Sequence, residues 1–170
     1  MKMNLLVERS LIKSRLFNVD WKWGYIMRDR GSVVIIENKK VALIKRNKNN
    51  SVYYVFPGGG IKNEETPEEG AIREALEELG VKVELEDCIA EIEYNGMQYF
   101  FLAEIIGGTF GAGEGAEYTD MNRNTGTHLP IWINIRKLSA INIIPREVAL
   151  KIEAIYKWWI FCGRIILKGI

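Results

Sequence analysis

Three glutamates between residues 74 and 78 have the spacing needed to bind a divalent cation. Glu74, Glu77 and Glu78 are related as i, i+3 and i+4, so on a helix their carboxylates share one face. Carboxylates this close repel one another unless a cation lies between them. Mg²⁺ prefers oxygen ligands and commonly bridges carboxylates to substrate phosphates. The spacing therefore predicts a magnesium site that holds a pyrophosphate group.

The helix that must present these carboxylates has sequence signals at both ends. Thr66 and Glu69 form a capping box, and Pro67 occupies the first helical position, where a missing N–H costs little. Gly80 can adopt the left-handed conformation that ends a helix. We expect a helix from Pro67 to Leu79. Its apolar stripe, which we expect to face a core, consists of Ala71, Ile72, Ala75, Leu76 and Leu79.

A glutamate-rich helix with an apolar stripe is, taken alone, typical of a solvated surface helix. A metal site is favoured because these glutamates belong to a longer series of glycines, an Arg–Glu pair and a Glu–Glu pair at fixed spacings. Arg73 in this series is rotated by more than a quarter turn from Glu74, which favours a structural ion pair with Glu65 over a substrate contact. The lead-in glycines let the backbone approach a metal or phosphate closely. The series is Pro57–Gly58, Gly59, Glu65, Arg73–Glu74, Glu77–Glu78 and Gly80–Val81.

From Gly59 to Val81 this series fills every fixed position of the Nudix box, so the chain resembles the Nudix hydrolases, in particular MutT-like members. The resemblance spans about residues 28–156. It implies an α/β fold of the Nudix type, an α/β/α sandwich with a mixed β-sheet between helices. It also implies water attack on the diphosphate of a nucleoside diphosphate linked to another group X. Mg²⁺, or Mn²⁺ as a substitute, would lower the pKa of the bound water.

The resemblance also assigns roles to individual residues. Glu74, Glu77, Glu78 and the carbonyl of Gly59 would bind the metal, and Glu74 is either a ligand or the general base. Arg73, Glu74 and Glu78 are the catalytic residues expected within the box. Glu117, in the glycine-rich segment 107–127, is our choice for an additional ligand or base. A solvent-exposed acidic loop is an equally good interpretation of that segment.

The residues that recognise the group X are not evident from the sequence. Base stacking is possible for Tyr53, Tyr99, Phe101, Tyr118 and Trp132, although alternating aromatic residues on strands more often belong to a core. His128 either donates to a phosphate or is an ordinary polar residue before a strand. The small size favours a (deoxy)nucleoside triphosphate as substrate. The alternatives are an ADP-ribose or nucleotide-sugar pyrophosphatase and, in another class, a non-catalytic nucleotide-sensing Nudix domain.

Composition limits the other partners. A net charge of +1 gives no electrostatic reason to expect nucleic-acid or membrane partners. No stretch approaches the roughly 20 apolar residues that a membrane span requires. The two cysteines, Cys88 and Cys162, lie far apart and suggest reduced thiols in a cytoplasmic protein. We therefore expect a cytoplasmic enzyme with a small nucleotide substrate.

The chain of 170 residues suits one domain. We expect an N-terminal extension over residues 1–27 that packs on the domain, a Nudix domain over 28–160 and a C-terminal tail over 161–170. Tryptophans in and near the terminal segments either support a homodimer or complete the core. Within the domain we expect a hairpin of residues 33–36 and 41–44, a strand over 52–56, strands over 81–85 and 131–135, a hairpin around Asn95–Gly96, and a closing helix over 145–160.

Overall fold

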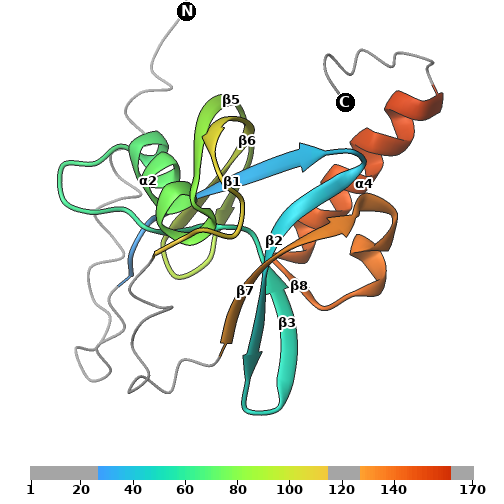
Figure 1. Ribbon diagram of the computed structural model, residues 1–170, viewed down its shortest axis with the longest axis horizontal. Coiled ribbons are helices and arrows are strands. Elements are labelled where there is room, and N and C mark those ends of the chain that lie inside the picture. Colours follow the sequence, from blue (N-terminus) through green and yellow to red (C-terminus); the bar gives the residue numbers. More distant parts are fainter. Residues whose placement is uncertain (1–26, 115–126, 162–170) are drawn as a thin grey trace, which may run out of the picture.

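A mixed β-sheet with a helix on each face forms the body of the computed structural model, which describes residues 27–114 and 127–161 (Figure 1). The elements are β1 (Arg30–Glu37), β2 (Lys40–Lys48), β3 (Ser51–Val55), β4 (Gly58–Gly60), α2 (Pro67–Leu79), β5 (Val81–Glu93), β6 (Met97–Gly108), β7 (Thr127–Asn134), the 3₁₀ helix η1 (Ile135–Ala140), β8 (Ile143–Ile144) and α4 (Arg146–Phe161). The predicted α/β class, with a mixed sheet between helices, is confirmed.

Strand β1 is the centre of the sheet because it pairs in both directions. It runs antiparallel to β2 and β4 and parallel to β6. The strand order is β5-β6-β1-β2-β3-β8, with β7 beside β2 and β4 beside β1. Both predicted hairpins form. The β1–β2 turn has positive φ at both of its residues, Asn38 (48°) and Lys39 (62°). A two-residue turn needs this conformation to match the twist of the two strands that it connects.

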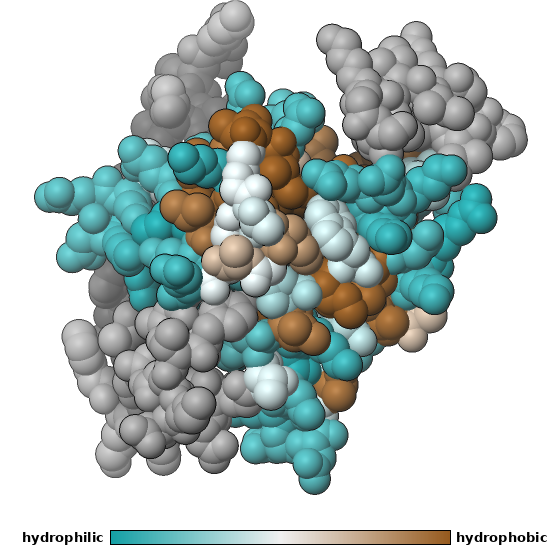
Figure 2. Space-filling view, viewed as in Figure 1, coloured by the Kyte–Doolittle hydropathy of each residue, from teal (hydrophilic) through white to brown (hydrophobic). Residues whose placement is uncertain are grey.

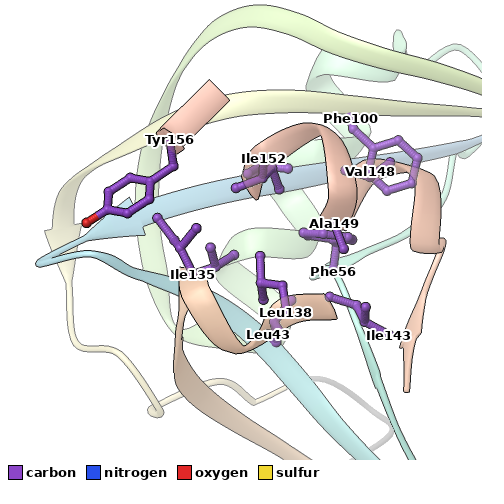
Figure 3. Close-up of a cluster of buried hydrophobic side chains, with 12 residues drawn as sticks. Leu43, Phe56, Phe100, Ile135, Leu138, Ile143, Val148, Ala149, Ile152 and Tyr156 are labelled. Carbon is purple, nitrogen blue, oxygen red and sulfur yellow. The ribbon is translucent and has the colours of Figure 1, made fainter. Parts of the chain in front are cut away.

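Alternation along β1 and β2 separates two apolar cores, because successive strand residues point to opposite faces. Val33 and Ile35 face α2, where they pack with Ala71, Ala75 and Leu79. Val34, which lies between them, belongs to the core on the opposite face, beneath α4. In that second core, α4 and η1 pack on the sheet through Leu43, Phe56, Phe100, Ile135, Leu138, Val148, Ala149, Ile152 and Tyr156 (Figure 3).

Helix α2 lies directly on the backbone of β1 at Gly31. A Cβ at this position would overlap the carbonyl oxygen of Pro67 and would come within 2.9 Å of the Ala71 nitrogen. Both contacts are with backbone atoms of the helix, which cannot swing aside. The absence of a side chain at Gly31 therefore sets the distance between β1 and the first turn of α2.

The apolar stripe of α2 is narrower than the sequence predicts. Ala71, Ala75 and Leu79 are fully buried, but Ile72 is 41% exposed and Leu76 is 48% exposed. The prediction that these two residues face a core is wrong. Each lies one residue beyond a buried alanine, a rotation of roughly 100° that turns it past the line of contact with the sheet. Other apolar areas also reach the surface between hydrophilic residues (Figure 2).

Several element boundaries differ from prediction, and three of the differences affect the interpretation of the site. Strand β7 begins at Thr127 and not at Ile131, so His128 lies within a strand and not before it. Strand β5 is continuous over 13 residues where two strands were expected, because irregularities in its pairing with β6 absorb the interruption. Strand β6 extends to Gly108, into the glycine-rich segment 107–127 that was interpreted as a loop. The closing helix is confirmed as α4.

Several predictions concern residues outside the described ranges. They include the N-terminal extension with Trp21 and Trp23, the residues Glu117 and Tyr118, and the C-terminal tail with Cys162. The packing of the extension, the tail and a homodimer therefore stay predictions. None of the helices in the described part of the chain is long and apolar enough to cross a membrane.

A matched pair of substitutions tests the packing of α2. Leu79→Ala removes a fully buried side chain and should lower the free energy of unfolding by roughly 2–5 kcal/mol. Leu76→Ala, the same change one turn earlier at a 48% exposed position, should cost less than about 1 kcal/mol. Urea unfolding followed by circular dichroism measures both values. Equal losses would show that α2 contacts the sheet through a different face.

Candidate active site

Helix α2 begins and ends as its sequence predicts. The hydroxyl of Thr66 accepts a hydrogen bond from the Glu69 N–H (3.2 Å), and the Glu69 carboxylate accepts one from the Thr66 N–H (2.9 Å). Gly80 ends the helix with φ of 76°. These caps satisfy backbone groups that a helix leaves unpaired at its ends. They also fix which residues of α2 face the glycine-rich strand β4.

Two of the three predicted carboxylates lie against β4. Glu78 Oε2 accepts a hydrogen bond of 2.8 Å from the N–H of Gly58. A Cβ on Gly59 would overlap the carboxylate of Glu74, so this position must be glycine while Glu74 keeps its place. Glu77 lies farther out, with its side chain 43% exposed and Oε1 at 3.7 Å from Nζ of Lys62. The structure therefore brings Gly59, Glu74 and Glu78 together and leaves Glu77 at the rim.

Arg73 connects the loop before α2 to the carboxylates on the helix. Its guanidinium donates two hydrogen bonds to Glu65, from Nε to Oε1 (2.6 Å) and from Nη2 to Oε2 (3.0 Å), which confirms the predicted ion pair. Nη1 donates to Glu74 Oε1 at 2.6 Å and lies 3.4 Å from Glu77 Oε2. The contact with Glu74 was not predicted. Arg73 is thus the cation that separates three carboxylates.

Two more arginines bind the same glycine-rich segment, and neither was predicted from the sequence. Arg28 donates from Nε to the Ile61 carbonyl and from Nη2 to the Gly60 carbonyl, each at 3.1 Å. Arg30 Nη2 donates to the Gly58 carbonyl at 2.9 Å. The only signal was a pair of cationic residues just before an apolar strand, which does not indicate partners about thirty positions away.

The ion pair between Arg73 and Glu65 changes the pKa of both groups. Hydrogen bonds from Arg73, followed by one from the Lys62 N–H, lower the pKa of Glu65 from 4.5 to about 2, because each favours the ionised carboxylate. The hydrogen bond to Glu65 raises the pKa of Arg73 above its ordinary value, and the bond to Glu74 adds to this effect. Both groups therefore stay ionised in the neutral pH range.

Most aromatic candidates for base recognition take part in packing. Tyr99 and Phe101 stack with ring centroids 6.4 Å apart, and Trp132 packs on Phe110 at 4.7 Å. Tyr53 lies on β3 and is partly exposed. His128 is 8% exposed and lies opposite Arg46 of β2. These positions belong to the sheet, and the segment that contains Glu117 and Tyr118 lies outside the described residues.

The donor atoms of this site suit a hard divalent cation. The carboxylates of Glu74, Glu77 and Glu78 and the backbone of Gly59 all offer oxygen ligands, which Mg²⁺ and Mn²⁺ prefer. As they are placed, however, no three acidic, histidine or cysteine side chains among residues 27–114 and 127–161 converge closely enough to hold an ion. The side chain of Glu77 is 43% exposed against 15% for Glu74, and it would have to move toward the other two carboxylates for all three to share one cation.

The pH dependence of stability tests the Glu65 ion pair. Since the pKa of Glu65 is lower in the folded chain, the ionised carboxylate stabilises the fold above pH 4.5, and this contribution is lost as the pH falls toward 2. Glu65→Gln should therefore destabilise the protein at pH 7, and the difference from wild type should shrink below pH 4.5. Urea unfolding between pH 7 and pH 3 measures the difference.

An Arg73→Met background provides the control for this measurement, because Glu65 there has no guanidinium to bind. In that background Glu65→Gln should have a smaller effect at pH 7. A Glu65→Gln effect in the wild-type background that stays constant down to pH 3 would contradict the assignment.

Comparisons with known proteins give a family and a fold. The family model of the NUDIX domain matches residues 27–138, well over half of the chain. No curated protein matches the sequence. Among solved structures, the chain is similar to an ADP-ribose pyrophosphatase from Streptococcus suis, with 17% identity over 81% of this chain and 92% of that one, and a TM-score of 0.54.

Two other structures show a comparable likeness. One comes from work on MutT of Aliivibrio salmonicida and Vibrio cholerae, with 19% identity over 75% of this chain and 98% of that one, and a TM-score of 0.56. The other is a UDP-X diphosphatase, with 16% identity over 94% of this chain and 73% of that one, and a TM-score of 0.55. At these identities the likeness shows the fold. With the NUDIX match and the box residues assembled on α2 and β4, the chain belongs to the Nudix hydrolase family.

Proposed function

We propose that this Nudix hydrolase cleaves the diphosphate linkage of a nucleoside diphosphate linked to a group X, in a reaction that depends on Mg²⁺ or Mn²⁺. The observation that carries the proposal is the placement of Glu74 and Glu78 against the backbone of Gly58 and Gly59. The missing side chain at Gly59 lets the Glu74 carboxylate lie directly on the backbone of β4, beside the Glu78 carboxylate at Gly58. That surface is suited to a metal-bound diphosphate.

In this proposal Glu77, Glu78 and the Gly59 carbonyl hold the metal, and Glu74 is either a further ligand or the general base. When bound, the metal would supply charge neutralisation at the diphosphate and would lower the pKa of the attacking water. The chain's own residues supply the orientation. The Gly58 N–H anchors one oxygen of Glu78, which directs the carboxylate along β4. Arg73 anchors Oε1 of Glu74 and so acts as a positioning residue for it.

The general base is assigned to Glu74, or to Glu117 in the segment outside the described residues. Two observations favour Glu74. Its side chain is only 15% exposed, and Arg73, fixed by Glu65, holds one of its oxygens. A carboxylate held in one orientation is suited to position an attacking water.

The first candidate substrate is a (deoxy)nucleoside triphosphate, which suits a single small domain. An ADP-ribose or nucleotide-sugar pyrophosphatase is the second candidate, because structures named for ADP-ribose and UDP-X substrates share this fold at similar scores. A nucleotide-sensing domain without turnover is the third. All box carboxylates are present, which disfavours the sensor. We place the reaction in the cytoplasm, with no nucleic-acid or membrane partner.

A substrate panel with Mg²⁺ or Mn²⁺ tests the reaction, with products separated by ion exchange. The panel contains canonical and oxidised nucleoside triphosphates, ADP-ribose, nucleotide sugars, dinucleoside polyphosphates and coenzyme A. Triphosphates should release pyrophosphate or phosphate, whereas ADP-ribose should release AMP and ribose phosphate. Binding of a nucleotide without turnover, by folded protein in the presence of Mg²⁺, would favour the sensor instead.

Glu78→Gln separates the charge of this residue from its structural contact. The amide keeps an oxygen that can accept from the Gly58 N–H, so the melting temperature should change little. Loss of the ligand charge should lower turnover by at least about 100-fold, the upper end of what outer-shell partners of a metal cost. Glu68→Gln, the same change at an exposed position in the first turn of α2, is the control and should leave turnover near wild type. Equal activity of the two variants would refute the assigned role of Glu78.

A further inference from the structure

Residues 108–113, called here the cap segment, run from the end of β6 across the C-terminal end of α2. The N–H of Gly111 donates to the Leu79 carbonyl at 2.8 Å, and the N–H of Thr109 donates to the Gly80 carbonyl at 3.0 Å. Ala112 N–H closes the segment on itself by donating to the Thr109 carbonyl at 3.1 Å. The last carbonyls of a helix have no partner within the helix, so the cap segment supplies partners for this end of α2.

The cap segment also packs against the turn that contains Glu77 and Glu78. A Cβ on Gly113 would lie 2.5 Å from the Glu78 carbonyl oxygen and 2.7 Å from that of Glu77. A Cβ on Gly80 would lie 2.6 Å from the Ala112 carbonyl carbon and 2.8 Å from the Gly113 nitrogen. Backbone therefore lies on backbone at both positions. Neither surface can yield by rotating a side chain.

An aromatic contact fixes the cap segment to the sheet. The ring of Phe110 lies 4.7 Å from that of Trp132, at an interplanar angle of 31°, and both belong to the core beneath α2. Trp132 is opposite Ala42 in the pairing of β7 with β2. The cap segment is thus attached to the sheet through Phe110 and to the helix through hydrogen bonds on both sides of that residue.

We propose that the cap segment is a positioning element for Glu77 and Glu78, and that Gly113 is its critical residue. The inference rests on the proposed metal site. Both glutamates lie in the last turn of α2, where a helix without external partners frays. Productive sites hold their ligands to within about 0.5 Å. Contact of Gly113 with the carbonyls of these two residues provides that restraint from outside the helix.

Calorimetric titration with Mn²⁺ alone tests the proposal, because it requires no substrate. Gly113→Ala should weaken Mn²⁺ binding by roughly tenfold or more, the range found when groups that support metal ligands are lost. Gly107→Ala is the matched control. A Cβ at position 107 meets only side-chain carbons of Lys82 at 3.8 and 3.9 Å, so Mn²⁺ affinity should equal that of wild type.

A second variant covers the case in which Gly113→Ala does not fold. Gly111 has φ of 90°, and no heavy atom lies within 4 Å of the place that a Cβ would occupy, so Gly111→Ala strains the cap segment without a collision. It should weaken Mn²⁺ binding to a smaller degree. In addition, excess Mn²⁺ should restore turnover in the cap-segment variants and fail to restore it in Glu78→Gln.

Folded Gly113→Ala or Gly111→Ala protein that binds Mn²⁺ as tightly as wild type would overturn the positioning role, even with a lower melting temperature. That result would leave the proposed function intact. Wild-type protein that binds no Mn²⁺ and cleaves no substrate would overturn the proposed function, and the positioning role with it.

Discussion

Close contact between glycine backbone and helix α2 is the constraint on which the site depends. Gly31 lies against the first turn of the helix, Gly59 against the carboxylate of Glu74, and Gly113 against the turn of Glu77 and Glu78. At each point a side chain would collide with atoms that the site requires. The helix is therefore held at its beginning, middle and end by three segments that are distant in sequence. The contacts at Gly31 and Gly113 are with backbone atoms of the helix, which cannot yield by rotating a side chain.

The same arrangement concentrates negative charge, and the arginines balance it. Glu65, Glu74 and Glu77 all contact Arg73, while Arg28 and Arg30 bind carbonyls of the adjacent glycines. Arg73 donates both to Glu65 and to a proposed metal ligand, so it links the loop before α2 to the carboxylate face of the helix. A cation that draws Glu74 toward itself competes with only one of the contacts of Arg73. The pair with Glu65 keeps the guanidinium in place when this happens.

How well the sequence predicts a feature of this structure depends on how far apart in the sequence the interacting residues lie. The capping box of Thr66 and Glu69 and the turn at Asn38–Lys39 involve neighbours in sequence, and both form as predicted. The exposure of Leu76 depends on which line of residues along α2 contacts the sheet, and no local pattern encodes that line. Residues 107–127 combine several glycines with a lack of hydrophobic periodicity, which predicts a loop without regular structure. The described part of that segment instead extends β6 and binds the end of α2. The residues in contact there lie about thirty positions apart in the sequence, so no local pattern reveals them.

The contacts that hold the carboxylates and the residues predicted from the sequence as candidates for recognition of X belong to different elements. The carboxylates depend on α2, β1, β4 and the cap segment, whereas Tyr53 and His128 lie on β3 and β7. A substitution at Tyr53 on β3 would therefore test recognition of X without touching the contacts of Glu74 or Glu78. This separation lets one fold serve several substrates with the same chemistry. It is also the physical reason why an intact box predicts the bond that is cleaved and leaves X undetermined. The substrate must be identified by its products.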